Sequence, residues 1–495
     1  MEKFDLIVIG SGPGGWAAAM RAVDLNKHVC IIEKSSLGGA GVFHGALTSK
    51  TMWQLSRDFA IASRVDRGYR ASGLQVDFQK VIQSVRAAAK AKIYQIKSQI
   101  ETLTKSHFEN CSLTLKHGHA RFVDQYTVEI ENGDSKEQIK GESIIIATGS
   151  RPRPYPGIEV DHYRIINSDD VMRMKEFPER MIIVGSGIIG TEFATIFSNF
   201  KQTEVHLLDR QHRVIPFEDD DVSDFVSKNL ENNGVKIHHT ANLREINKQE
   251  DSLEVVLDYD DGHSQVLEVD VAFLAIGRIP NTDDLGLEKV GIEPNAQGNL
   301  LTDSQSRLSS KFGYTNIFGV GDITGTTQLY SVAEMQGRFA VRGIYNQISY
   351  PLSYYNMPTL MFFNPEVAAV GLNEKSLQEL QIPYRMVSYS NNLVNRAIAM
   401  RNTDGFVKIL VSDDGEERIL GMRAAGPQAS AFIVSIAHIM NQKNSLDQIL
   451  RTIHPHPSLT EGIQECLRVF KNKSIFKPYA FPDYIKTSSW KPEEE

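Results

Sequence analysis

Cysteine is scarce in this sequence: three residues, Cys30, Cys111 and Cys466, lie far apart in a chain of 495. This number and spacing exclude a disulfide scaffold, a zinc site and a CxxC redox motif, and we expect no metal centre. Basic residues are in no excess either, because 53 lysines and arginines stand against 61 acidic residues, which gives a formal charge of −8. Without a basic surplus to neutralise phosphates, the protein is not expected to bind nucleic acid.

Long apolar runs are also missing. No run approaches the ~18 residues of a membrane span, and the N-terminus, Met1 to Asp5, lacks the basic and apolar parts of a signal peptide. We therefore expect no membrane span and a cytoplasmic location. A chain of this length with 41% hydrophobic and 23% charged residues indicates several globular domains.

One pattern occurs twice along the chain. Residues 4–33 and 181–209 each begin with an apolar, β-branched run typical of a buried parallel strand, which leads into a glycine-rich turn. A helix-forming stretch follows, and then a second apolar run that ends in an acid, Glu33 or Asp209. Each copy is therefore predicted to fold as strand, turn, helix and strand.

The glycines of both turns have the spacing of a dinucleotide-binding motif. The first glycine permits a tight bend, the second lets the backbone approach a pyrophosphate, and the third lets the helix pack on the strand. Both acids follow about 20 residues after the first glycine, where a carboxylate reaches an adenosine ribose. Two such sites predict two nucleotides, and hydride exchange between them requires a flavin beside a nicotinamide. The glycines are Gly10, Gly12, Gly14 and Gly15 in the first turn and Gly185, Gly187 and Gly190 in the second.

The remainder of each half continues the repeat. Turn signals at residues 132–133 and 261–262 precede closing strands at 143–149 and 271–277. Residues 78–106 are rich in helix formers and predict a long helix.

The pattern changes at residue 351, after which hairpin strands alternate with helices, as is typical of an α+β domain. The predicted fold class is therefore α/β, with two nested Rossmann-like dinucleotide-binding domains and a C-terminal α+β domain.

Seven segments together resemble the pyridine nucleotide-disulfide oxidoreductases, flavoproteins such as dihydrolipoamide dehydrogenase, glutathione reductase and soluble transhydrogenase. They are residues 10–15, 147–149, 185–190, 275–281, 319–322, 364–366 and 454–457. The resemblance spans nearly the whole chain and implies FAD and a nicotinamide dinucleotide as cofactors, and a homodimer formed through the C-terminal domain. The implied domains are a FAD-binding domain in two parts (1–155 and 280–350), an NAD(P)-binding domain (156–279), a dimerisation domain (351–480) and a solvated tail (481–495).

The resemblance also assigns residues to the two cofactors. Glu33 would bind the FAD ribose, Asp322 would bind the ribityl chain or phosphate, and Lys50 and Glu192 would pair beside flavin nitrogen 5. The residues implied at FAD are Gly10, Gly12, Pro13, Gly14, Gly15, Glu33, Lys34, Gly39, Lys50, Gly118, Ala120, Thr148, Gly149, Asp322, Leu329, Ser331 and Ala333. Those implied at the nicotinamide nucleotide are Gly185, Gly187, Ile188, Ile189, Gly190, Glu192, Asp209, Arg210 and Gly277.

The choice between the two nicotinamide nucleotides depends on the end of the second repeat. Asp209 favours NAD(H), because an acid there binds the free 2′-hydroxyl and repels a 2′-phosphate. Arg210 and Arg213 follow and leave NADP(H) open as a second cofactor.

The chain departs from the family at its redox disulfide. Relatives carry two cysteines shortly before the lysine that corresponds to Lys50, and alignment on that lysine places Gly41 and Ala46 at the cysteine positions. Because disulfide exchange requires a thiolate, turnover of dihydrolipoamide or glutathione by the usual route should be absent. The remaining reaction is hydride transfer from a nicotinamide to FAD and on to a small acceptor, such as a quinone, a second nicotinamide or oxygen.

A histidine and a glutamate near the C-terminus also match the family. His456 and Glu461 resemble the acid–base pair of dihydrolipoamide dehydrogenase, which reaches the flavin of the partner subunit. A carboxylate-held histidine is suited to proton transfer near neutral pH. Without thiols, the pair either protonates another reduced product or is an inherited part of the dimer interface. A cis bond before Pro457 is expected from the same resemblance.

Two alternatives stay open. The chain could be a dihydrolipoamide dehydrogenase-like subunit of a 2-oxo acid dehydrogenase complex, which turnover of dihydrolipoamide would support. It could instead be a non-catalytic flavoprotein that acts as a sensor or scaffold, which would retain FAD but would not be reduced by NADH.

Overall fold

The computed structural model describes residues 1–43, 45–104, 111–313, 315–347, 351–440, 442 and 445–493. Its chain divides into two compact units. The first unit consists of Met1–Leu55, Arg70–Phe177 and Leu274–Leu352, and the second of Ser56–Tyr69, Pro178–Phe273 and Ser353–Glu495. Among the described residues, no helix has the length and apolar character needed to cross a bilayer.

The first unit is built on a seven-stranded sheet with the order β3-β2-β1-β6-β5-β4, in which β17 also pairs with β6. These strands are β1 (Glu2–Ile9), β2 (His28–Glu33), β3 (Ser112–His117), β4 (His119–Phe122), β5 (Thr127–Asn132), β6 (Ser135–Ile146) and β17 (Ile317–Gly319). β1 pairs in parallel with both β2 and β6, whereas β4, β5 and β6 are antiparallel. The other elements are α1 (Pro13–Val23), α2 (Gly39–Val42), α3 (Ala46–Ala62, shared between the units), α4 (Phe78–Thr104), α7 (Tyr330–Ile344), β7 (Ser150–Pro152), β8 (Ile165–Asn167), β16 (Arg278–Pro280), η1 (Val171–Arg173), η2 (Leu287–Val290) and η3 (Gly321–Thr324).

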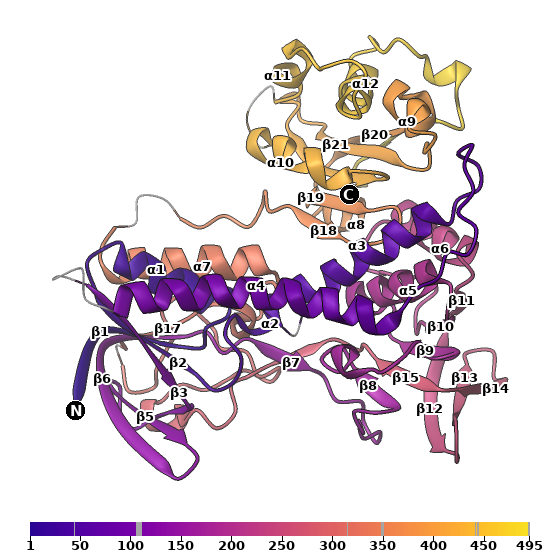
Figure 1. Ribbon diagram of the computed structural model, residues 1–495. Helices are drawn as coiled ribbons and strands as arrows, with labels where there is room; N and C mark the ends of the chain where they lie inside the picture. The colour runs from indigo at the N-terminus through magenta and orange to yellow at the C-terminus, as the bar shows by residue number, and fades with distance from the viewer. Residues whose placement is uncertain are drawn as a thin grey trace. The chain divides into compact units, whose positions relative to one another are not determined.

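Both faces of this sheet are buried, which explains the continuous apolar run of β1. Leu6 and Val8 pack with α1, α4 and α7, which lie together on one face of the sheet (Figure 1). Ile7 and Ile9 belong to the core of the opposite face. α1 and α7 pack so closely that a Cβ at Gly337 would overlap the backbone of α1.

The second unit contains the second repeat and the C-terminal domain. Its parallel strands have the order β11-β10-β9-β15, and two antiparallel sheets follow, with the orders β12-β13-β14 and β18-β19-β22-β21-β20-β23. The strands are β9 (Arg180–Val184), β10 (Glu204–Leu208), β11 (Lys236–His238), β12 (Ala241–Lys248), β13 (Leu253–Tyr259), β14 (Ser264–Val269), β15 (Val271–Leu274), β18 (Thr359–Met361), β19 (Val367–Gly371), β20 (Tyr384–Ser390), β21 (Phe406–Ser412), β22 (Ile419–Ala425) and β23 (Ile485–Trp490). The helices are α5 (Ile188–Phe200), α6 (Asp220–Asn232), α8 (Glu374–Glu379), α9 (Asn395–Ala399), α10 (Ala429–Ile439), α11 (Ser445–Arg451), α12 (Thr460–Phe470), η4 (Asn391–Leu393) and η5 (Pro478–Ala480).

These elements confirm the predicted α/β fold class. β1, α1 and β2 form the first strand-turn-helix-strand copy, and β9, α5 and β10 form the second. The predicted hairpins join β5 to β6 and β13 to β14, and the predicted long helix is α4. The bond before Pro457 is cis, as expected, and so is the bond before Pro365.

The predicted solvated tail is wrong over Ile485–Trp490. This segment is β23, an antiparallel strand beside β20, with Tyr384 paired to Trp490. The ring of Trp490 stacks on that of Tyr384 with 6.0 Å between the centroids, and Ile485 is buried. Residues 486–489 are exposed and polar. This composition is typical of a solvated tail, and it also suits an edge strand.

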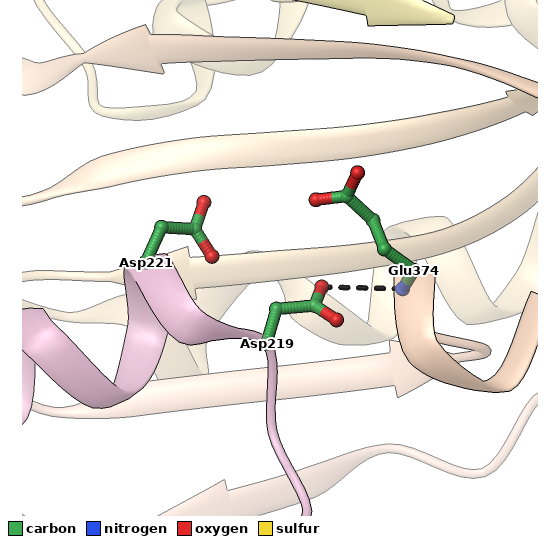
Figure 2. A group of neighbouring side chains, drawn as sticks. All are labelled: Asp219, Asp221 and Glu374. Atoms are coloured by element: carbon green, nitrogen blue, oxygen red, sulfur yellow. Dashed lines mark hydrogen bonds between the residues drawn. The ribbon is translucent and has the colours of Figure 1, made fainter. Parts of the chain in front are cut away.

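A buried ion cluster joins α6, α8 and β21 inside the second unit. Lys408 is fully buried, and its Nζ lies 2.8 Å from Asp219, 2.7 Å from Asp221 and 2.8 Å from Glu374. Figure 2 shows the three carboxylates converging, and Asp219 also accepts a hydrogen bond from the backbone nitrogen of Glu374 at 3.2 Å. Burial disfavours the charged lysine, but the three acids outweigh it and hold the pKa of Lys408 above its ordinary value. These acids are the one group among the described residues that could hold a metal ion, and the ammonium already lies between them.

We expect Lys408→Met to destabilise the second unit, because three carboxylates would be left without their cation. Removing one partner of a buried ion pair costs about 3–5 kcal/mol, measurable as a loss of unfolding free energy in denaturant. Lys375→Met is the matched control, since Lys375 pairs with Asp220 at 3.0 Å with a side chain that is 40% exposed. An exposed pair contributes only ~0–1 kcal/mol. Equal losses in the two variants would contradict this account of the cluster.

Candidate functional site

The first glycine turn is shaped by close backbone packing. A Cβ at Gly15 would overlap the carbonyl oxygen of Gly10, so the start of α1 can lie on the end of β1 only with glycine there. Gly12 differs, because no heavy atom of the described chain lies within 4 Å of a Cβ built on it. Gly12 is also the N-cap of α1, and no side chain of the described residues caps that end. Open space before uncapped N–H groups fits a bound pyrophosphate.

The second turn repeats this geometry in the other unit. A Cβ at Gly190 would overlap the carbonyl oxygen of Gly185, whereas Gly187 faces open space within the described structure. Gly187 is the N-cap of α5, again without a side-chain cap among the described residues. Ile188 and Ile189 open the helix. The two turns therefore have the same geometry, and both fit a bound phosphate.

The two acids after the turns are in different hydrogen-bonding states. Glu33 is buried and fully engaged: one oxygen accepts from the backbone and hydroxyl of Ser11 at 2.9 and 2.7 Å, and the other accepts from the backbone of Ser35 at 2.8 Å. Its carboxylate therefore holds the first turn in shape. Lys34 beside it is exposed.

Asp209 carries a buried oxygen that lacks a partner. Its Oδ1 accepts from the backbone nitrogen of Gln211 at 2.9 Å, but Oδ2 has no partner among the described residues. Burial raises the pKa of the Asp209 carboxyl above its ordinary value, although the backbone of Gln211 and the hydroxyl of Ser186 act in the opposite direction. An unsatisfied buried acceptor costs about 1–3 kcal/mol, and a ribose hydroxyl would satisfy it. The chain therefore fits a nicotinamide adenine dinucleotide at this position.

The basic residues beside Asp209 are not equivalent. Arg213 is held by two acids, with Nε 2.8 Å from Asp224 and a terminal nitrogen 3.3 Å from Asp220. Arg210 is exposed. With Arg213 engaged by two acids, Arg210 is the arginine better placed to meet a 2′-phosphate.

The predicted adenine position of FAD lies beside a hollow. Gly118, at the β3–β4 junction, has φ +150° and donates to the carbonyl of Glu33 at 3.0 Å, and Ala120 is buried on β4. A hollow of ≈ 410 Å³ opens nearby, and its lining includes Ser35, Lys97 and His117. Space next to these positions is compatible with an adenosine group.

Several residues predicted at the flavin are tied into one network. Asp322 accepts from the hydroxyl of Ser150 at 2.5 Å, and Ser150 Oγ accepts from Arg278 at 2.8 Å. Thr148 and Asn281 exchange two hydrogen bonds, of 2.6 and 2.9 Å. The network fixes β7 against β16, which pair as antiparallel strands. It was not foreseen from the sequence, although Arg278 lies within, and Ser150 next to, a segment that carries the family resemblance.

The other predicted flavin residues lie around this network or near the first turn. Gly149 has φ +68°, which favours glycine there, and so does φ +101° at Gly277, which is predicted at the nicotinamide nucleotide. Gly39 has φ +50°, and a Cβ there would lie 3.3 Å from Gly12. Leu329 is the N-cap of α7, where the described residues provide no side-chain cap; Ser331 is exposed and Ala333 is buried.

Lys50 and Glu192 belong to different units. Lys50 lies on α3 in the first unit, and Glu192 is buried on α5 in the second, where it accepts from the backbone nitrogen of Phe362 at 3.1 Å. Their ion pair stays a prediction.

His456 and Glu461 are brought together as a pair. The Nδ1 atom of His456 lies 2.8 Å from a Glu461 oxygen, whose other oxygen accepts from the backbone of Ser458 at 2.8 Å. Burial raises the pKa of Glu461, but these hydrogen bonds outweigh it and the net pKa lies below the ordinary value. The carboxylate is thus charged at neutral pH, orients the exposed imidazole, and leaves Nε2 to exchange a proton.

The three cysteines are unpaired and buried. Burial raises the pKa of Cys30 to about 12 and also raises that of Cys466, which lies on α12. A buried, protonated thiol is a poor nucleophile, so Cys30 and Cys466 are unsuited to thiol–disulfide exchange.

Comparisons with known proteins agree with this geometry. A family model described as pyridine nucleotide-disulphide oxidoreductase matches residues 4–337, and the dimerisation domain of that family matches residues 357–467. A dihydrolipoyl dehydrogenase from Geobacillus stearothermophilus is 32% identical over 467 residues, which cover 94% of this chain and 96% of that protein. A soluble pyridine nucleotide transhydrogenase from Marinobacter nauticus is 33% identical over 467 residues, 93% of this chain and 96% of that one.

Solved structures show the same fold. LpdA from Mycobacterium tuberculosis superimposes with a TM-score of 0.84 at 25% identity, covering 95% of this chain and 100% of that one. The flavoprotein disulfide reductase RclA from Escherichia coli gives a TM-score of 0.80 at 24% identity over 94% of this chain and 99% of that chain. With both repeats, the C-terminal domain and these relatives in agreement, the chain belongs to the pyridine nucleotide-disulphide oxidoreductase family and is a flavin-dependent oxidoreductase.

Proposed function

We propose that this protein is an NADH-dependent flavoenzyme that delivers electrons from FAD to a small acceptor other than a disulfide. The observation that carries the proposal is the loss of both sulfurs, since Gly41 and Ala46 stand at the family's cysteine positions. The candidate acceptors are a quinone, a second nicotinamide or oxygen. NADP(H) remains a secondary donor through Arg210.

Each glycine turn would bind one of the two nucleotides. The backbone of Gly12 and the start of α1 would hold the FAD pyrophosphate, and Asp322 would meet its ribityl chain or phosphate. The backbone of Gly187 would hold the nicotinamide nucleotide, and the free oxygen of Asp209 would accept its ribose hydroxyl. Bound FAD supplies a carrier that accepts two electrons as hydride from a nicotinamide. Lys50 and Glu192 would pair beside it and control access.

His456 is proposed to supply a proton to the reduced acceptor. Glu461 holds its Nδ1 side, so the opposite nitrogen would face the acceptor. The alternative is that His456 and Glu461 only shape an interface. In that case the orientation of the His456 ring by Glu461 would have no role in the reaction.

A homodimer is part of the same proposal. The chain has the family's dimerisation domain, and large apolar side chains of that region are exposed in the single chain: Ile453 is 93% and Tyr479 84% exposed. A second copy would cover such side chains. The unpaired cysteines are in keeping with a reducing compartment such as the cytoplasm.

A second candidate function is dihydrolipoamide dehydrogenation, which relatives of that name and the His456–Glu461 pair favour. It requires a redox disulfide that this chain lacks. A flavin-binding sensor or scaffold is the third candidate, and reduction by NADH distinguishes it from the first two.

The direct test is an anaerobic titration of the purified FAD protein with NADH, followed by absorbance near ~450 nm. We expect bleaching at about one equivalent of NADH per flavin, rapid recovery with a benzoquinone, and no turnover of dihydrolipoamide. Absence of bleaching with both NADH and NADPH would favour the sensor, and lipoamide turnover would favour the second candidate.

Two valine substitutions serve as reciprocal controls, because Gly12 and Gly187 have ordinary negative φ angles and open space beside them. Gly12→Val should leave a folded protein without FAD. Gly187→Val should retain FAD but weaken NADH binding about tenfold or more, through loss of backbone–phosphate contact.

Asp209 should make dinucleotide binding dependent on pH. Because burial raises its pKa, Asp209 becomes protonated at a higher pH than an ordinary aspartate, and NAD⁺ binding should weaken as pH falls through that value. We expect Asp209→Asn to bind NAD⁺ about tenfold more weakly at neutral pH and with a flat pH profile in calorimetry. Asp224→Asn is the control, since Asp224 is exposed and pairs with Arg213. An unchanged pH profile in Asp209→Asn would rule out this assignment.

His456→Gln should separate the two half-reactions. Bleaching by NADH should be unchanged, whereas reoxidation by a benzoquinone should slow about 100-fold, a typical contribution of acid–base catalysis. His263→Gln is a matched control, because His263 is another exposed histidine held by a carboxylate, at 2.5 Å from Asp261. Rapid-mixing absorbance measures both steps, and equal reoxidation rates would leave His456 without a role in proton transfer.

A further inference from the structure

The first of the two lost cysteine positions is filled by a neighbouring ring. A Cβ built on Gly41 would lie 2.8 Å from Cε2 and 3.0 Å from Cδ2 of Tyr330, and 2.7 Å from Cγ of Pro13. Contacts below 3.0 Å are not tolerated by real Cβ atoms, so any side chain at position 41 requires Tyr330 or Pro13 to move. Gly41 and Tyr330 thus form a complementary pair, in which one residue has no side chain and the other has a large one.

Tyr330 presents part of its ring to solvent. It is the first residue of α7, next to the uncapped N-terminus predicted at the flavin, and it is 44% exposed although one ring edge packs against Gly41. Burial, with a smaller effect of Glu334, raises the pKa of its phenol, which therefore remains a hydrogen-bond donor at neutral pH.

We propose that Tyr330 is the specificity-determining residue of the acceptor site: its ring excludes a disulfide at position 41 and offers an aromatic surface to a planar acceptor of the quinone class. This inference rests on the proposed function. Aromatic rings bind flat conjugated molecules by offset stacking, and the phenol can donate to a quinone carbonyl. A disulfide substrate or a bulky aliphatic one gains neither contact.

The reaction requires only NADH, a proton and the quinone. NADH supplies one hydride, which carries two electrons, and one proton comes from solvent or from His456. The quinone takes up two electrons and two protons to become a hydroquinone, and NAD⁺ is released. Tyr330 takes no part in the transfer, and it only positions the acceptor.

The steric half is tested by rebuilding the cysteine pair with and without the ring. Gly41→Cys with Ala46→Cys should keep both introduced thiols free after mild oxidation, as counted by a thiol reagent in the unfolded protein. Adding Tyr330→Ala should let the two thiols form a disulfide, because residue 41 can then shift away from Pro13 into the space left by the ring. A disulfide in the double variant, or its absence from both, would overturn the steric role of Tyr330.

The acceptor half is tested by steady-state kinetics with a water-soluble benzoquinone. Tyr330→Ala should raise the KM for the quinone about tenfold with little change in kcat, whereas Tyr330→Phe should raise it less, because the ring stays and only the hydrogen bond of the phenol is lost. Met335→Ala is the matched control, since Met335 is exposed on the same helix. An unchanged KM in Tyr330→Ala overturns this half. Bleaching by NADH, recorded for each variant, shows separately whether the proposed function holds, and the thiol count does not depend on it.

Discussion

Contact between backbone atoms inside each glycine turn is the constraint on which the rest of the molecule depends. Gly15 lies so close to the carbonyl of Gly10, and Gly190 to that of Gly185, that a Cβ at either position would overlap the oxygen. This contact sets each helix directly on the end of its strand, so that the helix N-terminus opens onto the space beside Gly12 or Gly187. The open space at both helix starts, where we propose that phosphates bind, is therefore a consequence of this packing.

The same physics explains how much of the fold the sequence could predict. Both repeats were recognisable because glycine spacing and apolar runs reflect local backbone geometry, which the chain encodes within about 30 residues. β23 was missed because this edge strand buries only Ile485 and partly covers Trp490, and it carries exposed polar residues between them. The Lys408 cluster was not predictable, since its acids come from α6 and α8 while the lysine lies on β21, and no local pattern links them.

The sequence placed Glu33 and Asp209 at equivalent points of the two repeats, but it could not predict the hydrogen bonds that their carboxylates make. Glu33 and Asp209 occupy equivalent places in the two repeats, and the sequence gives them the same interpretation. The structure separates them: Ser11 and Ser35 saturate Glu33, whereas one oxygen of Asp209 has no partner in the described chain. That difference depends on neighbours that no spacing rule includes. It makes the Glu33 carboxylate a support for the first turn and leaves one oxygen of Asp209 that could accept a hydrogen bond from a nucleotide.

The packing around Gly41 bears on the proposed absence of a redox disulfide. If glycine had only replaced a cysteine at position 41, the neighbouring residues would leave room for a side chain there. Instead the ring of Tyr330 lies against Gly41, so that a cysteine could return only if a second residue or the backbone changed as well. Because the two positions depend on each other, a cysteine introduced at position 41 alone would clash with the ring of Tyr330. The packing of Tyr330 and Pro13 against Gly41 thus holds this segment in a form that has no room for a side chain at position 41.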